Sequence, residues 1–378
     1  MKVNFITNLP LQEVSGGFSG MNVAAHEALA EIAEVHCVGP ISPRTSPVGR
    51  LAAKLKRSLR TPAKFFAFSE ARLQQIAEQV ARQRRRDADL DFYHGFTPWI
   101  RCVSPVPYAA WSDCCFRDYL DIYHPAGSFD ECDIARICSS ESKWMRGARA
   151  ALLSSEWARL RTKAHYNLPD TLLGNVGIFG AMEIPAQDCH NGGRGFLFIS
   201  TDFARKNGLL CCQAMQRVWR EAPEATLTIL GAVPPAHLLA DPRVRYEGYF
   251  DKSKPDQLAM FARHLSRAFA LIHPTTADTT AMVVIEAAFY GCPSITVRDF
   301  ALPEVTGNGA CATLLDRPVT ADTLAQAMIS LIFNQRYYHD LRARARDFSI
   351  RRFSRGAFKK RLQDRVRHII SEAETKRA

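Results

Sequence analysis

Residues 271–295 read LIHPTTADTTAMVVIEAAFYGCPSI and contain the clearest secondary-structure signals of the chain. An apolar run ends at Pro274, a polar loop follows, and a helix is expected to begin near Thr280. Gly291 and Pro293 mark the end of that helix, because glycine just past a helix and proline shortly after it are strong stop signals. The stretch therefore predicts a strand, a polar loop and a short helix in succession.

Two acidic residues bracket the start of this helix. Asp278 comes just before it and Glu286 lies two turns into it, which separates the two carboxylates by about 12 Å at 1.5 Å per residue. The free amides of the helix N-terminus lie between them, and such amides bind anions. The spacing suits a diphosphate held between a sugar and a ribose. A capped amphipathic helix with an acidic loop residue is the structural alternative.

The same residues carry a resemblance to a known family. Asp278, Glu286-Ala287 and Gly291-Cys292-Pro293 resemble the glutamate-x7-glutamate signature of retaining glycosyltransferases of the GT-B fold, specifically family 4 (glycosyl transferases group 1). Asp278 stands where the family usually has glutamate, and Thr280-Ala281 replace the usual aromatic-glycine pair. The resemblance implies an α/β fold in which two Rossmann-like domains have parallel sheets facing a central cleft.

The resemblance also implies roles for individual residues. Glu286 would hold the ribose hydroxyls, and Asp278 would touch the donor sugar. The loop 200–208 resembles the family's Arg-Lys-Gly loop, where Arg205 and Lys206 would stabilise the charge of a leaving diphosphate. An ordinary basic helix start is the alternative for this loop. The other residues expected at the donor are Gly16, Gly17, Thr201, Tyr249, Phe250, Thr280, Ala281 and Met282.

The first half of the chain opens with a strand over 3–7 and a glycine-rich loop over 15–20. Glycine lets a backbone approach a ligand closely because it has no Cβ. Gly16 and Gly17 are therefore candidates for contacts with the donor diphosphate, as the resemblance also implies. A common glycine-rich turn is the alternative.

Two residues at strand ends of the first half are candidates for the acceptor side. His94 ends a strand-like run, and the resemblance implies that it faces the acceptor, where an imidazole would orient or polarise a hydroxyl at neutral pH. A histidine with a purely structural role is the alternative. Asp113 closes the next apolar segment and is a weaker candidate for the same side.

The second half alternates between strands and helices. Such alternation implies a parallel sheet covered on both faces, and ligands of such sheets bind beyond the carboxyl ends of the strands. We expect a first domain at 1–188, a linker at 187–194, a second domain at 189–354 and a helix from about 355 to 378 that packs back on the first domain. The expected strands are 195–200, 225–231, 244–248, 268–273 and 294–297, and a long helix is expected over 321–348.

Length and composition are those of a globular protein with two domains. The chain has 378 residues, 47% of them hydrophobic and 23% charged. No apolar run approaches the roughly 20 residues needed to span a bilayer, and MKVNFITNL is too short and too strand-like for a signal peptide. Eleven scattered cysteines without C-x-x-C spacing indicate reduced thiols in a cytoplasm rather than disulfides or zinc sites.

The net charge of +11 is concentrated locally. Residues 50–66 carry six basic side chains and no acidic one, and a second basic block covers residues 82–86. Leucines and phenylalanines alternate with the basic residues of the first block, which suits peripheral contact with an anionic membrane on its inner face. A solvated segment without a ligand is the alternative.

Together with these patterns, the family resemblance implies a cytoplasmic, metal-independent, retaining hexosyltransferase of glycan, polysaccharide or glycolipid synthesis. It would bind no cofactor, because Arg205, Lys206 and helix amides can neutralise the leaving group. Its donor would be a UDP- or GDP-sugar and its acceptor a hydroxyl of a glycan or lipid-linked glycan. A catalytically inactive binding or scaffold protein is the first alternative, and a nucleic-acid-binding protein that uses residues 50–86 is a second, less expected one.

Overall fold

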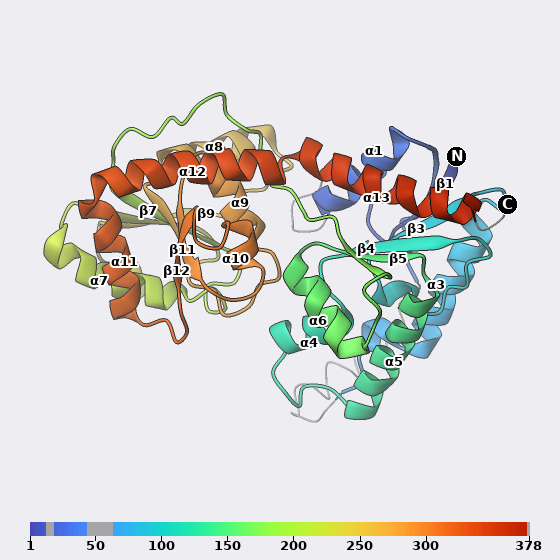
Figure 1. The fold of residues 1–378 in the computed structure, drawn as a ribbon. Helices are drawn as coiled ribbons and strands as arrows, with labels where there is room; N and C mark the ends of the chain where they lie inside the picture. Colours follow the sequence, from blue (N-terminus) through green and yellow to red (C-terminus); the bar gives the residue numbers. More distant parts are fainter. Residues whose placement is uncertain (13–18, 44–62, 376–378) are drawn as a thin grey trace. The chain divides into compact units, whose positions relative to one another are not determined.

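The computed structural model describes residues 1–12, 19–43 and 63–375 (Figure 1). These residues form two compact units, each built around its own sheet. The first unit contains residues 1–12, 19–43 and 63–177 together with the last helix over 359–375, and the second contains Ile178–Phe358. None of the described helices is long and apolar enough to cross a membrane.

The first unit is a six-stranded parallel sheet in the order β2-β1-β3-β4-β5-β6. Its strands are β1 (Lys2–Ile6), β2 (Glu34–Val38), β3 (Leu90–His94), β4 (Tyr108–Ser112), β5 (Ala150–Leu153) and β6 (Leu173–Asn175). Every residue of β3 and β5 is buried, as expected for strands covered on both faces. Its helices are α1 (Ser19–Ala30), α3 (Glu70–Gln83), α4 (Phe116–Tyr123), α5 (Glu131–Gly147), α6 (Glu156–Tyr166) and most of α13 (Arg355–Thr375).

Helix α13 packs on the first unit through both polar and apolar contacts. The Lys359 ammonium lies 2.9 Å from a carboxylate oxygen of Glu27 and 2.8 Å from one of Glu31, both near the end of α1. The guanidinium of Arg361 donates to the carbonyl of Val176 at 2.8 Å. The apolar face of α13 is fully or almost fully buried at Leu362, Val366 and Ile369. Spacings of three and four residues place these apolar side chains on one face of the helix.

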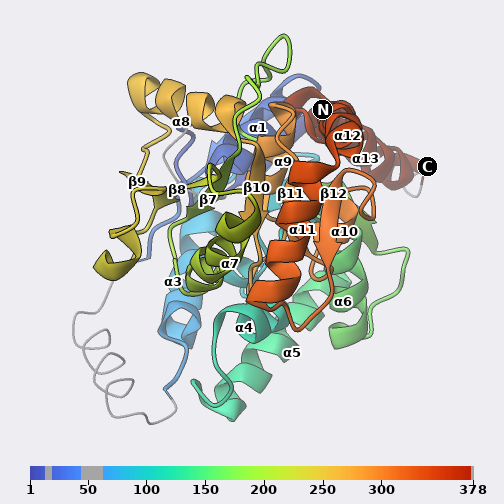
Figure 2. The ribbon, with the colours of Figure 1, turned by 90° about the vertical axis from the view of Figure 1, so that its left-hand side faces the viewer.

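The second unit is also a six-stranded parallel sheet, in the order β12-β11-β10-β7-β8-β9 (Figure 2). Its strands are β7 (Gly195–Ser200), β8 (Thr226–Gly231), β9 (Val244–Gly248), β10 (Ala270–His273), β11 (Ser294–Val297) and β12 (Ala312–Leu315). Its helices are α7 (Gly208–Glu221), α8 (Pro255–Arg267), α9 (Met282–Phe289), α10 (Leu302–Val305), α11 (Ala321–Phe333) and α12 (Gln335–Phe353).

The helices of the second unit form two groups. Helix α7 packs against α11, and α9 packs against α8 and α12. The strand order changes direction between β7 and β10, so right-handed crossovers place the two groups on opposite faces of the sheet. The predicted α/β class, with two parallel-sheet domains of Rossmann-like build, is thereby confirmed. The reversal point between β7 and β10 is also where sheets of this kind bind ligands.

Two sequence-based expectations for the second unit are wrong. The single helix expected over 321–348 is two helices, because Asn334 ends α11 and its side chain accepts the Tyr337 amide at 3.2 Å to cap α12. The segment 187–194, expected as a linker, is part of the second unit. Asp188 anchors it there through a bidentate salt bridge, in which Nη2 and Nε of Arg342 donate to Oδ1 and Oδ2 of Asp188 at 2.6 and 2.7 Å.

Candidate active site

The carboxyl edge of the second sheet brings two polar loops together. One follows β7 and contains Arg205, and the other follows β10 and leads into α9. Asn207 donates to the carbonyl of Pro274 at 2.7 Å, and Thr276 donates to the carbonyl of Arg205 through both its amide, at 3.0 Å, and its hydroxyl, at 2.7 Å. Neighbouring parallel strands bring their following loops to the same edge, and here hydrogen bonds join the two loops.

Lys206 and Asp278 form an ion pair between these loops. The Lys206 ammonium lies 2.5 Å from Oδ2 of Asp278 and also donates to the carbonyl of Ala277 at 2.6 Å. The two side chains are 18% and 14% exposed, respectively. Within the described part of the chain, two of the three ammonium hydrogens have acceptors, so the group is oriented before any ligand arrives.

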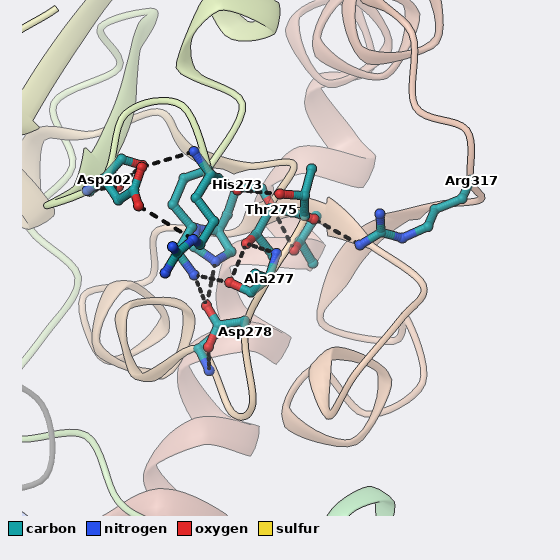
Figure 3. A network of polar contacts seen from close by, with 12 residues as sticks. Asp202, His273, Thr275, Ala277, Asp278 and Arg317 are labelled. Carbon is teal, nitrogen blue, oxygen red and sulfur yellow. Dashed lines mark hydrogen bonds and ion pairs between the residues drawn. The ribbon is translucent and has the colours of Figure 1, made fainter. Parts of the chain in front are cut away.

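The Asp278 carboxylate accepts from three donors. Besides Lys206, they are Nε2 of His273 at 3.2 Å and the amide of Ala281 at 2.9 Å (Figure 3). Burial by itself would raise the pKa of Asp278, but His273 and Lys206 hold that pKa well below its usual range. Asp278 is therefore an anion at all ordinary pH values, and its charge is directed towards the protein's own donors.

His273 is a member of this network that the sequence did not single out. It is the last residue of β10 and is almost completely buried. Burial lowers the pKa of His273, an effect that Asp278 opposes, so the neutral imidazole donates from Nε2 to the carboxylate. The available signal was its position, because a polar residue that closes an apolar strand lies at the edge where ligands bind.

The start of α9 depends on a left-handed residue. Ala281 has φ +49°, and α9 begins at Met282 rather than near Thr280 as expected. This conformation costs a residue with a Cβ free energy that glycine avoids. Asp278 compensates by accepting the Ala281 amide. Thr280 is buried in the same turn, and Met282 is the first helical residue of α9.

Glu286 lies in the middle of α9 and is paired with a second lysine. Its side chain is 2% exposed, and its Oε2 lies 2.6 Å from the ammonium of Lys252, in the loop between β9 and α8. Its Oε1 accepts the amide of Ala181 at 3.2 Å. Lys252 was not among the predicted residues. Its partner is distant in sequence, and the basic loop Lys252–Lys254 by itself resembles an ordinary solvated turn.

The remaining predicted donor residues lie on the same edge of the second sheet. Arg205 is exposed, and its Nε lies 3.4 Å from Oδ2 of Asp202. Thr201 is the first residue after β7. Tyr249, directly after β9, is 54% exposed, whereas the Phe250 ring packs on Phe261 and His264 of α8. Tyr249 is therefore exposed, whereas Phe250 is partly buried against α8.

His94 and Asp113 lie at the carboxyl edge of the first sheet, as predicted from their strand-end positions. His94 ends β3, is almost completely buried and packs against Trp111, with ring centres 5.5 Å apart. Burial lowers the pKa of His94 to about 3, so its imidazole is neutral at physiological pH. Asp113 follows β4, and its side chain accepts the Cys114 amide at 2.9 Å. Gly16 and Gly17 lie outside the described residues.

No metal-binding cluster is found in the described part of the chain. Within residues 1–12, 19–43 and 63–375, no group of three or more His, Cys, Asp or Glu side chains is arranged to hold a metal ion. The charged groups at the edge of the second sheet are instead organised as lysine–carboxylate pairs.

Comparison with known proteins finds a family model that matches part of the second unit. Residues 193–334 match the family model described as glycosyl transferases group 1. This matched region contains Lys206, Lys252, Asp278 and Glu286. No curated protein sequence matches the chain.

Several solved structures share the architecture. Sucrose-phosphate synthase from Thermosynechococcus elongatus has a TM-score of 0.71 at 13% identity, covering 98% of this chain and 99% of that one. HepE from Anabaena in complex with UDP has a TM-score of 0.67 at 12% identity, covering 97% of this chain and 100% of that one. TarM has a TM-score of 0.57 at 12% identity over 74% of this chain, which spans only 54% of TarM's length.

Similarity at these identities establishes the fold and no more. The two six-stranded parallel sheets and their helices match GT-B structures along nearly the whole chain. This chain accordingly has the GT-B fold, and its second unit carries the pattern of the glycosyl transferases group 1.

Proposed function

We propose that this chain is a retaining glycosyltransferase that moves a sugar from a nucleoside diphosphate sugar to a hydroxyl acceptor. The observation that carries the proposal is the placement of Lys206–Asp278 and Lys252–Glu286 around α9, inside the region that matches the family model. The UDP bound by the similarly folded HepE supports a nucleoside diphosphate as the leaving group.

The donor diphosphate would bind at the loops before α7 and α9. The amides at the start of α9 and the cations Arg205 and Lys206 are suited to its negative charge. Arg205 offers a planar fork and Lys206 a point charge, so the two would hold different oxygens. These groups would stabilise the charge that grows on the leaving diphosphate, which makes a metal-independent reaction the proposed one.

Sugar and ribose would lie on either side of the diphosphate. Glu286 would accept hydrogen bonds from the ribose hydroxyls, and Asp278 would border the donor sugar. Thr201, Tyr249, Phe250, Thr280 and Met282 complete the proposed donor surface, together with Gly16 and Gly17 from outside the described residues.

In the proposed reaction, the acceptor oxygen attacks the anomeric carbon on the face that the diphosphate leaves. The bond from this carbon to the diphosphate oxygen breaks as the new carbon–oxygen bond forms, and the acceptor's proton passes to the leaving diphosphate. The configuration at the anomeric carbon is thereby retained. On the first unit, His94 and Asp113 are the proposed acceptor contacts, because they lie at the carboxyl ends of β3 and β4, the edge of a parallel sheet where ligands bind.

The proposed donor is a UDP- or GDP-hexose, and the proposed acceptor is a glycan or lipid-linked glycan. Such a reaction belongs to glycan, polysaccharide or glycolipid synthesis. The basic block at residues 50–66 is the proposed contact with an anionic membrane, and nearly all of it lies outside the described residues.

Thermal unfolding with UDP, GDP, ADP and their sugar conjugates tests the donor site. A ligand present at 100 times its dissociation constant adds about 2.7 kcal/mol to stability. We expect a clear increase in Tm with one of the three bases. If folded protein shows no increase with any of them, the proposal is wrong.

A catalytically inactive binding protein is the second candidate, and one observation favours it. Asp278 is shorter than the usual glutamate and already accepts from three donors of the protein. Such a protein would bind the nucleoside diphosphate but would not release free sugar from its conjugate. Donor hydrolysis by the wild type that disappears in Glu286→Ala would eliminate this candidate.

A further inference from the structure

Lys252 occupies a position in the donor site that no sequence motif assigns. It lies in the loop between β9 and α8, with its ammonium 2.6 Å from Oε2 of Glu286. The Glu286 side chain is 2% exposed and that of Lys252 is 31% exposed. Lys252 is therefore the more exposed partner of the pair, and a ligand that reaches Glu286 also comes close to Lys252.

Two neighbours hold the Lys252 side chain in place. Its ammonium lies 4.4 Å from the centre of the Phe261 ring, whose face attracts a cation. Phe261 is itself buried in α8, so it presents a fixed surface. Together with Glu286 of α9, it anchors the lysine to two helices rather than to the loop alone.

The Glu286 carboxylate retains capacity for a ligand. Its Oε1 accepts the Ala181 amide and its Oε2 accepts the Lys252 ammonium. An ionised carboxylate offers about four lone-pair sites. Neighbouring ribose hydroxyls can thus be accepted while Lys252 stays in place.

The charge of Lys252 is important because the proposed ligand is an anion. A buried carboxylate without a counter-ion would repel a diphosphate bound at the nearby start of α9, and that repulsion is strong where water is excluded. The positive charge of Lys252 neutralises the Glu286 carboxylate and so removes this repulsion. Lys206 has the equivalent relation to Asp278.

We propose that Lys252 is a positioning residue of the donor site: it neutralises and orients Glu286 so that this carboxylate binds a ribose beside an anionic diphosphate. The inference rests on the glycosyltransferase function proposed above. It adds that the site selects a nucleoside diphosphate over the nucleoside partly through Lys252.

Isothermal titration calorimetry of the full chain tests this role. The titrants are the nucleoside diphosphate that raises Tm most, among UDP, GDP and ADP, and its parent nucleoside. Lys252→Met removes the charge, Lys252→Gln removes it but keeps a donor for Glu286, and Lys252→Arg keeps it. Lys254→Met is the matched control, because Lys254 lies in the same loop, is 64% exposed and is 4.0 Å from Asp251.

We expect Lys252→Met and Lys252→Gln to raise the Kd of the diphosphate at least tenfold and that of the nucleoside by less. Lys252→Arg should recover most of the affinity, and Lys254→Met should equal the wild type. In a Glu286→Gln background, the same Lys252→Met change should cost less than threefold, because the carboxylate charge that it compensates is gone.

Several results would overturn the inference without touching the proposed function. One is a Kd of Lys252→Gln for the diphosphate that equals the wild-type Kd. Another is that Lys252→Met weakens the binding of diphosphate and nucleoside by the same factor. A third is that Lys252→Met also raises the diphosphate Kd tenfold in the Glu286→Gln background. If Lys252→Met does not fold, Lys252→Gln supplies the same comparison. If the wild type binds none of the three diphosphates, the proposed function and the inference are both wrong.

Discussion

Two lysine–carboxylate pairs flank α9, and they differ in how each carboxylate is used. Asp278 accepts from Lys206, His273 and the Ala281 amide, so the protein occupies about three of the four acceptor sites of this carboxylate. Glu286 accepts only from Lys252 and the Ala181 amide among the contacts described, and it is the more deeply buried of the two. The comparison indicates that Asp278 mainly organises its loops, whereas Glu286 keeps acceptor capacity for a ligand.

The largest expected effect comes from Lys206. Among the described residues, two of the three hydrogens of its ammonium have acceptors, and the third would stabilise charge on the leaving diphosphate. Removal of one such donor typically lowers kcat by about 10²- to 10³-fold. We therefore expect Lys206→Met to reduce donor turnover by this factor, measured as release of nucleoside diphosphate. Lys254→Met serves as control, and turnover of Lys206→Met within threefold of wild type would contradict the assignment.

The next effect concerns Glu286 and donor affinity. Glu286→Gln keeps the shape of the side chain but removes the charge that strengthens its hydrogen bonds to ribose. Hydrogen bonds to charged groups are worth about 1.5–3 kcal/mol, so the donor Kd should rise about 10- to 100-fold. Calorimetry with the preferred diphosphate measures the change, and Glu221→Gln at the exposed end of α7 is the control. An unchanged Kd would remove ribose binding from the role of Glu286.

Asp278 should affect stability more than it affects donor binding. Asp278→Asn keeps an acceptor for the Ala281 amide but weakens the contacts with Lys206 and His273. Loss of these charge-assisted bonds should lower the free energy of unfolding by about 1–3 kcal/mol, measured by urea titration.

Asp278→Glu tests the sugar contact, because one added methylene should change donor preference among sugars that differ at one hydroxyl. Preference identical to wild type would argue against that contact.

His273 should make stability depend on pH. Its folded-state pKa lies below the ordinary value, so below about pH 6.5 the unfolded chain takes up a proton that the folded chain resists. Stability should therefore fall as pH decreases through this range, by at most about 1.4 kcal/mol per pH unit from this residue. Urea titrations between pH 5 and 7.5 should give a smaller slope for His273→Asn than for the wild type. Equal slopes would show that His273 is not held neutral.

The smallest expected effect is at the start of α9. Glycine removes the cost of the left-handed conformation at Ala281, so Ala281→Gly should raise the free energy of unfolding by about 0.5–1 kcal/mol. Ala288→Gly, inside the helix, should lower it by about 1 kcal/mol. The opposite signs of these two changes are the test, and destabilisation by both would show that Ala281 is not strained.

The sequence allowed the second unit to be predicted in more detail than the first. Its strands β7, β9 and β11 begin and end where the pattern placed them, because each is a short apolar run with clear turn signals. The break at Asn334 was missed because apolar periodicity continues across it, although asparagine is a preferred N-cap.

The site was predictable where its residues are close in sequence. Asp278 and Glu286 share one motif, and Lys206 belongs to a recognisable loop, so each was found from its neighbours. Lys252 and His273 are defined by contacts across the sheet edge, between loops that only the strand order brings together. Such contacts cannot be inferred from the spacing of residues along the sequence.

Donor hydrolysis tests the central claim most directly. The wild type, Lys206→Ala and Glu286→Ala would be incubated with UDP-, GDP- and ADP-sugars, and released sugar would be measured by proton NMR. We predict that the wild type releases sugar from one class of donor and that both variants lose this activity. Release by the variants at the wild-type rate, or none by folded wild type that binds the diphosphate, would contradict the catalytic account of this site.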